Sequence, residues 1–201
     1  MAGEEQGMIA RCALLAVAAS LPLLAIEEPP YKVLQKSERF EVRQYESLPL
    51  VSTPMGGMRG DGRSFMRLFG YISGNNEGRK KIAMTAPVFM EGDGTDEGGA
   101  AGRMSFLIPA EVAEAGSPEP GGKQVSLHTM ASGRFAVLRF SGHREEAKRL
   151  AAVRSLRGWV KENGWEAEGE PFFAYYDPPG TPEDKRRNEV WLRLAAGPES
   201  D

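Results

Sequence analysis

Cysteine and histidine are scarce in this chain of 201 residues. Cys12 is the single cysteine, so the chain forms no intramolecular disulfide and lacks the thiolates for a zinc site. Its two histidines, His128 and His143, are too few for most histidine-based metal sites. We therefore expect no metal site built from the protein's own side chains.

An excess of positive charge is also lacking. The formal net charge is −3, which argues against a nucleic-acid partner. The folded part contains no Gly-x-Ser-x-Gly elbow, no His-Glu-x-x-His pair, no phosphate-binding loop and no cysteine nucleophile. We predict a non-enzymatic protein with no catalytic residues.

A long hydrophobic run is the third absence. The uncharged stretch from Cys12 to Ile26 is shorter than the roughly 20 residues of a spanning helix, and Pro22 interrupts it, so we expect no stable membrane span. Its length and small residues favour a secretory signal peptide with cleavage after Ser20 or Ala25.

The acidic start of the chain, with Glu4 and Glu5, speaks against a signal peptide, and a hydrophobic N-terminal helix or anchor is the other possibility. We predict a signal peptide or hydrophobic segment over 1–26, one folded domain over 27–196 and a frayed tail over 197–201. The protein is expected to be a monomer, secreted if 1–26 is a signal peptide and cytoplasmic otherwise.

The stretch from Asp61 to Val88 is the most informative part of the chain. Its apolar positions Phe65, Leu68, Phe69 and Ile72 have i, i+3, i+4, i+7 spacing and predict one amphipathic helical face. Asp61 can cap this helix, whereas Gly74 and Asn75 end it. Such a face ordinarily packs in a core, and the alternative is a surface for a ligand.

A strand is predicted over Ile82–Met90, after the basic turn 78–81, and Pro87 places it at an edge, a bulge or a strand end. The remaining predicted elements are the strands Phe40–Tyr45, Leu48–Thr53, Met104–Ile108, Gln124–Met130, Arg134–Phe140, Phe172–Tyr176 and Glu189–Leu194, and a second amphipathic helix over Glu145–Asn163.

These elements form the order strand-strand-helix-strand-strand twice, with equivalent elements roughly 85 residues apart, which indicates an internal duplication. We predict an α+β fold: a distorted antiparallel β-barrel of two such repeats with the two helices packed outside. A groove between a helix and the sheet is a natural place for a ligand.

Five strings together resemble the SOUL haem-binding protein family: 31-YKVL, 40-FEVRQY, 65-FMRLFGYISGNN, 81-KIAMTAPV and 187-RNEVWL. The resemblance extends from about Tyr31 to Leu194. It implies a distorted barrel of two repeats with two long helices. It also implies binding of haem b or free porphyrin, as a bound ligand and not a catalytic group, in an apolar cleft beside the first helix.

A porphyrin is a large apolar plate with two propionates, so its site needs apolar side chains and cations at one edge. On the basis of the resemblance, the candidate tetrapyrrole-binding residues are Arg63, Phe65, Met66, Arg67, Leu68, Phe69, Ile72, Lys81 and Met84. For each arginine the alternative is a solvated position on the helix.

One branch of the family has a histidine, proposed as an iron ligand, where this chain has Gln44. An amide is a poor ligand for haem iron, so we expect weak or absent axial ligation. The predicted function is a non-enzymatic tetrapyrrole carrier or buffer. The alternative is an interaction or signalling module that acts through the second amphipathic helix, with tetrapyrrole binding incidental.

Overall fold

The computed structural model describes residues 26–55, 61–92 and 102–196. Within these ranges it contains nine strands, three α-helices and two 3-10 turns. The strands are β1 (Tyr31–Ser37), β2 (Phe40–Tyr45), β3 (Leu48–Pro54), β4 (Val88–Glu91), β5 (Arg103–Leu107), β6 (Ser126–Met130), β7 (Gly133–Phe140), β8 (Ala167–Tyr175) and β9 (Asn188–Leu194). The helices are α1 (Asp61–Ile72), α2 (Ala110–Glu114) and α3 (Glu146–Glu162), and the 3-10 turns are η1 (Glu77–Arg79) and η2 (Glu183–Lys185).

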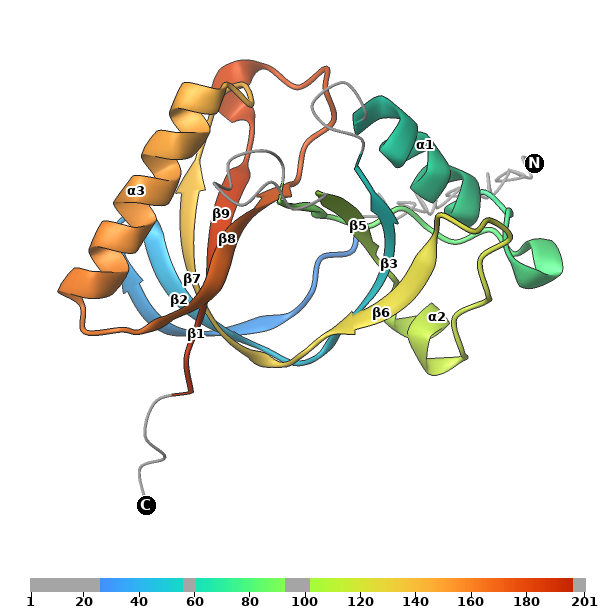
Figure 1. Ribbon diagram of the computed structural model, residues 1–201, viewed down its shortest axis with the longest axis horizontal. Helices are drawn as coiled ribbons and strands as arrows, with labels where there is room; N and C mark the ends of the chain where they lie inside the picture. The colour runs from blue at the N-terminus through green and yellow to red at the C-terminus, as the bar shows by residue number, and fades with distance from the viewer. Residues whose placement is uncertain (1–25, 56–60, 93–101, 197–201) are drawn as a thin grey trace, which may run out of the picture.

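The nine strands form one sheet in the order β1-β2-β7-β9-β8-β4-β5-β3-β6, and the neighbouring strands are antiparallel (Figure 1). The α+β class and the antiparallel sheet are therefore confirmed. The described strands pair only in this open order, without a ladder between β1 and β6, so closure into a barrel stays a prediction.

The strand order has an internal symmetry. Between β2 and β6 the order is β2-β7-β9-β8-β4-β5-β3-β6. If β2, β3, β4 and β5 are exchanged with β6, β7, β8 and β9 respectively, the same order is obtained when it is read backwards. Helix α1 lies between β3 and β4 in the chain, and α3 holds the equivalent place between β7 and β8. This symmetry is what a duplicated unit would produce.

Each face of the sheet carries its own hydrophobic cluster. The inner cluster joins residues of β2, β3, β4, β5, β7, β8 and β9, with Trp191 fully buried among them. Strands that are distant in the sheet order meet here because the sheet is strongly curved. The outer cluster contains Val42, Leu68 and Leu156, so α1 and α3 both cover the outer face.

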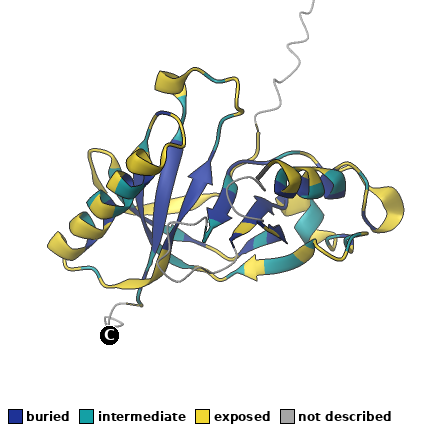
Figure 2. Ribbon diagram, turned by 45° about the horizontal axis from the view of Figure 1, so that its top comes forward, coloured by how far each residue is buried: buried dark blue, intermediate teal, exposed yellow. Residues whose placement is uncertain are grey.

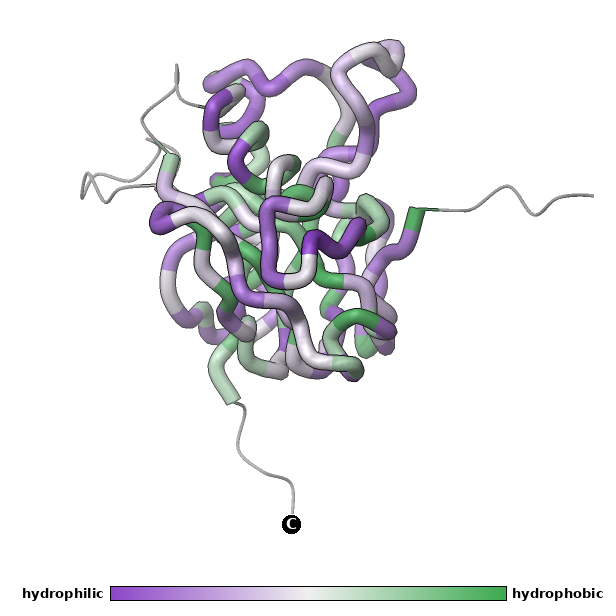
Figure 3. The backbone as a smooth tube through the Cα atoms, turned by 90° about the vertical axis from the view of Figure 1, so that its right-hand side faces the viewer, coloured by the Kyte–Doolittle hydropathy of each residue, from purple (hydrophilic) through white to green (hydrophobic). Residues whose placement is uncertain are grey.

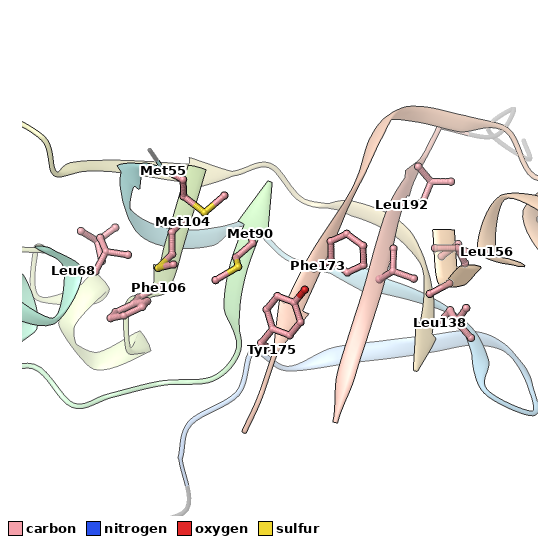
Figure 4. Packing of buried hydrophobic residues seen from close by; sticks show 14 of the residues in the cluster. Met55, Leu68, Met90, Met104, Phe106, Leu138, Leu156, Phe173, Tyr175 and Leu192 are labelled. Carbon is pink, nitrogen blue, oxygen red and sulfur yellow. The ribbon is translucent and has the colours of Figure 1, made fainter. Parts of the chain in front are cut away.

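The figures show how this core is arranged. In Figure 2 the strands are largely buried, whereas α3 exposes the side that turns away from the sheet. Figure 3, viewed from the α1 side, shows hydrophobic segments mostly in the middle and hydrophilic ones along the outer loops. Figure 4 shows the outer cluster running from Leu68 and Phe106 through Met90 and Phe173 to Leu156.

Helix α1 starts at Asp61 and ends before Gly74, and the predicted glycine stop is confirmed. Leu68, Tyr71 and Ile72 are buried against the sheet, which explains why the amphipathic pattern forms a helix here. Gly74 ends it with a φ of 116°, a left-handed value that glycine adopts without strain. The Asn76 side chain then fixes the turn by donating to the carbonyls of Tyr71 (2.7 Å) and Lys80 (2.8 Å).

The strand predicted over Ile82–Met90 is wrong in its first half, because only Val88–Glu91 pairs as β4. Residues 82–87 have no ladder of their own. Thr85 makes a single parallel bridge with Glu27, and Pro87, which follows a cis peptide bond, has no N–H to donate.

Three elements differ from the sequence prediction for identifiable reasons. Strand β1 was not predicted, because six of its seven residues are exposed and leave no alternating pattern. Helix α2 lies between the predicted strands Met104–Ile108 and Gln124–Met130 and is only five residues long. Strand β8 starts earlier than expected, at Ala167, because a bulge after Glu168 interrupts its pattern.

Candidate functional site

The predicted apolar face of α1 divides between core and solvent. Leu68 is fully buried and Ile72 is 6% exposed, so both are core residues that a ligand on the helix surface does not reach. Phe69 is 43% exposed and Met66 is 61% exposed, whereas Phe65 is half-buried. The division follows from the width of the stripe, since one edge faces the sheet while the other faces solvent.

The solvent edge of α1 carries a pair of stacked rings. The Phe65 and Phe69 rings lie 6.1 Å apart and are inclined by only 14°, and Phe65 also packs edge-on against Phe106 at 5.2 Å. Together with Met66 they form what we call the α1 aromatic surface: Phe65, Met66 and Phe69. It offers an aromatic and thioether patch for a flat apolar ligand.

Of the two candidate arginines, Arg67 is bound within the protein. Its Nε donates to Thr53 Oγ1 at 2.7 Å, and its Nη2 donates to Ser64 Oγ at 3.0 Å and to the Pro54 carbonyl. Arg63 is exposed and lies one turn before Met66, at the N-terminal end of the α1 aromatic surface. Arg63 is thus the arginine available to an anionic group, whereas Arg67 holds α1 on the end of β3.

Lys81 and Met84 lie in the segment that returns to the other end of the helix. The Ile82 N–H donates to the Ile72 carbonyl at 2.8 Å, which fixes this segment at the C-terminal end of α1. Lys81 is exposed, and Met84 is half-buried against the outer cluster. Arg63 and Lys81 therefore lie at opposite ends of α1, since residues 63 and 72 are about 13 Å apart along a helix. The two propionates project from the same edge of a porphyrin, so they would meet either Arg63 or Lys81.

The possible iron ligands lie away from this surface. Gln44 is on β2 between β1 and β7, whereas α1 packs mainly on β3 and β5. His128 pairs with Leu50 of the inner cluster and contacts Ser52 Oγ through Nδ1 at 2.9 Å. His143 precedes α3. Across the described ranges, no three His, Cys, Asp or Glu residues gather as a metal site would need.

The most strongly perturbed ionisable groups surround Glu189, whose side chain is fully buried. Arg43 donates to both of its oxygens, at 2.9 and 3.1 Å, and Arg187 Nε donates at 3.1 Å. Tyr176 Oη and Trp191 Nε1 donate at 2.8 and 2.9 Å. Five hydrogen bonds satisfy both oxygens, so this carboxylate is a structural anchor and not a free base.

The pKa values in this cluster reflect burial and pairing. Burial opposes the charge of Glu189, but hydrogen bonds and charge from Arg43 outweigh it and hold the pKa of Glu189 below its ordinary value. Burial, together with the Glu189 charge, raises the pKa of Tyr176. Arg187 also pairs with Glu28 at 2.8 Å, so the cluster ties the start of the described chain to β9.

None of the helices in the described ranges is long and apolar enough to cross a membrane.

The family model described as "SOUL heme-binding protein" matches residues 26–193. Heme-binding protein 1 of Xenopus tropicalis is 28% identical over 83% of this chain and 92% of its own length. Heme-binding protein 2 of Mus musculus is 29% identical over 84% of this chain and 86% of its own length.

Solved structures with similar folds are more distant in sequence. A structure described as a hydrolase from Listeria innocua has a TM-score of 0.56 at 12% identity, covering 81% of this chain and 94% of that one. The C-terminal domain of EcmrR has a TM-score of 0.50 at 13% identity, covering 82% and 98%. At this identity the likeness concerns the fold alone.

Proposed function

Because the chain belongs to the SOUL heme-binding protein family, we propose that it binds haem b or metal-free porphyrin on the α1 aromatic surface, as a non-enzymatic carrier or buffer. The observation that carries this site is the exposed ring of Phe69 stacked on the half-buried ring of Phe65. Exposed aromatic rings on a helix are costly to leave in water, and a flat apolar plate would cover them.

The residues of this surface suit a tetrapyrrole in shape and charge. Phe69 and Met66 supply exposed apolar contact, and Met84 adds a flexible side chain near the C-terminal end of α1. Arg63 or Lys81 would hold the propionates. His128 lies on the inner-cluster side of β3, away from the α1 aromatic surface, so it does not reach the iron of a haem bound there. Binding therefore relies on burial of the porphyrin plate and on propionate contacts, with weak or absent axial ligation.

Hemin titration followed in the Soret band tests this proposal. Phe69→Ala should weaken hemin binding about tenfold, equivalent to ~1.4 kcal/mol, because it removes one ring of the stacked pair. The matched control is Leu34→Ala on β1, since Leu34 has the same 43% exposure as Phe69 but lies on the edge strand. Equal hemin affinity in Phe69→Ala and the unaltered protein would reject the site.

The propionate contact and the ligand preference need separate measurements. Arg63→Gln and Lys81→Gln distinguish the two ends of α1, and we expect one of them to weaken binding more than the other. Titration with metal-free protoporphyrin tests the role of iron. Similar affinity for hemin and protoporphyrin is expected if the plate and not the iron provides the binding.

The interaction-module alternative has less support. Leu156 and Val160 of α3 are buried in the outer cluster, and Trp159 stacks on Phe40 at 5.2 Å with an inclination of 6°. The apolar side of α3 is therefore occupied by the sheet, whereas insertion into a partner's groove would require it to be free.

We further propose that the body is a barrel of two duplicated halves, a monomer without a nucleic-acid partner, and secreted if residues 1–26 act as a signal peptide. The symmetric strand order supports the duplication. Residues 1–25 and 197–201 lie outside the described residues, so the signal peptide and the tail remain predictions. Mass spectrometry of the mature N-terminus tests cleavage after Ser20 or Ala25, and light scattering tests the monomer.

A further inference from the structure

A second candidate site lies beside α3, at the opposite end of the sheet from α1 (Figure 1). A hollow of about 600 Å³ opens between α3, the end of β7 and the η2 turn. Its volume is in the range of small-molecule sites, roughly 300–1,000 Å³. We call it the α3 pocket.

Small side chains on α3 leave this space open. Ala151, Ala152 and Ser155 line the pocket together with Lys148, at i, i+3, i+4 and i+7 spacing on one helical face. Phe140, at the end of β7, adds a half-buried aromatic ring packed edge-on against the core. The pocket thus has an apolar surface that can contact the carbon skeleton of a ligand.

The rest of the lining is strongly basic. Its five cations come from four separate parts of the chain and face a single lining carboxylate, Asp184. They are Arg39, Arg139, Lys148, Lys185 and Arg186. Such a concentration of positive charge is unexpected in a chain whose formal net charge is −3.

Two of these cations are held in place by the protein. Lys148 Nζ lies 2.6 Å from Glu183 Oε1 and 3.9 Å from Glu145. The Arg186 guanidinium donates to the Thr181 carbonyl at 2.8 Å and to the Pro179 carbonyl, and its Nη1 lies 3.0 Å from His143 Nδ1. None of these three partners is a carboxylate, so they fix the orientation of Arg186 without neutralising its charge.

The other cations are available to an anion. In the parts of the chain that the structure describes, no carboxylate lies within ion-pair distance of Arg39, Arg139 or Lys185. Arg39 and Arg139 are adjacent, since the Arg139 N–H donates to the Arg39 carbonyl at 3.0 Å. Both residues line the same part of the pocket, and several cations around one hollow attract an anion with more than one charged oxygen.

We propose that the α3 pocket binds a small organic anion with at least two negative charges, a phosphate ester or a polycarboxylate. The anionic groups contact Arg39, Arg139 and Arg186, and the carbon skeleton lies on Phe140 and the small residues of α3. This site is separate from the α1 aromatic surface and does not depend on tetrapyrrole binding.

Isothermal titration of the full chain at low ionic strength tests the pocket with two probes, 1-naphthyl phosphate and citrate. We expect at least one to bind with a Kd on the order of 100 μM or tighter, and added salt to weaken it. Binding of one probe alone identifies phosphate esters or polycarboxylates as the ligand class. Failure of both to bind below about 1 mM overturns the proposal.

Matched variants distinguish the pocket from general charge. Arg139→Glu and Ala151→Leu should each lower the affinity for the probe at least tenfold. Arg139→Glu reverses a charge of the lining, whereas Ala151→Leu fills part of the pocket. The controls Arg154→Glu and Ala147→Leu change exposed α3 residues outside the lining and should stay within about twofold.

Unchanged probe affinity in Ala151→Leu would overturn the pocket as the binding place. Hemin binding should be the same in Ala151→Leu and the unaltered protein. Loss of hemin binding in Ala151→Leu would make the α3 pocket the tetrapyrrole site and overturn the proposal of a separate anion site. Loss of hemin binding in Phe69→Ala alone would leave the anion-site proposal unaffected.

Discussion

Glu189 provides a demanding test of how buried charge stabilises this fold. Its side chain is 1% exposed and that of its partner Arg43 is 4% exposed. Glu189→Gln keeps the shape of the side chain but removes the negative charge and places an NH₂ donor among five donors. Arg43 would then keep Glu41 on its Nε at 2.6 Å, but its two buried Nη groups would lose their charged acceptor.

Breaking a buried pair by removing one partner costs about 3–5 kcal/mol of unfolding free energy. For a chain of this size that corresponds to a decrease in Tm of roughly 6–20 °C. The assay is urea unfolding followed by circular dichroism, with the same slope required for both proteins so that the midpoints report stability.

The matched control is Glu170→Gln at the surface. Glu170 lies 2.6 Å from Arg157, closer than the 2.9 Å of the Glu189 pair, but the two side chains are 68% and 44% exposed. We expect this change to cost less than about 1 kcal/mol, because solvent screens the pair. Similar losses in the two variants would refute the argument that burial, and not distance, determines the contribution.

Three further predictions concern stability and the haem spectrum. The pKa of His128 is lowered by burial and by the Arg103 charge, so its contribution to stability is lost as pH falls below about 6.5. The lowered pKa of Glu189 adds a second loss below about pH 4.5, and Glu189→Gln should flatten that acid limb of a pH-dependent urea series. Leu156→Ala should cost about 2–5 kcal/mol in urea unfolding and the half-buried Leu150→Ala clearly less; equal costs would contradict the packing of α3. The visible spectrum of the hemin complex should lack a low-spin bis-histidine pattern and be unchanged in His128→Ala, and a sharp bis-histidine spectrum would reject plate burial as the main source of binding.

The hydrophobic periodicity of the sequence predicted much of the architecture. The i, i+3, i+4, i+7 spacing from Phe65 to Ile72 is intrinsic to a helix, and the two helices and most strands follow from such periodicity. Periodicity could not reveal β1, because its residues are exposed on a sheet edge, or the start of β8, where a bulge breaks the alternation. It also predicted too long a strand before Pro87, where the chain is extended but pairs only through Thr85.

The sequence by itself determined that α1 is amphipathic, that the chain resembles one haem-binding family and that it cannot form an intramolecular disulfide. Only the tertiary structure decided which side of α1 remains for a ligand, because the sheet covers Leu68 and Ile72 and leaves Phe69 outside. It also brought together residues that no local pattern connects: Arg43 pairs with Glu189 across 146 positions, and Arg39 and Arg139 line one pocket. The physical reason is that strand pairing sets these neighbours, and pairing depends on contacts far apart in the chain.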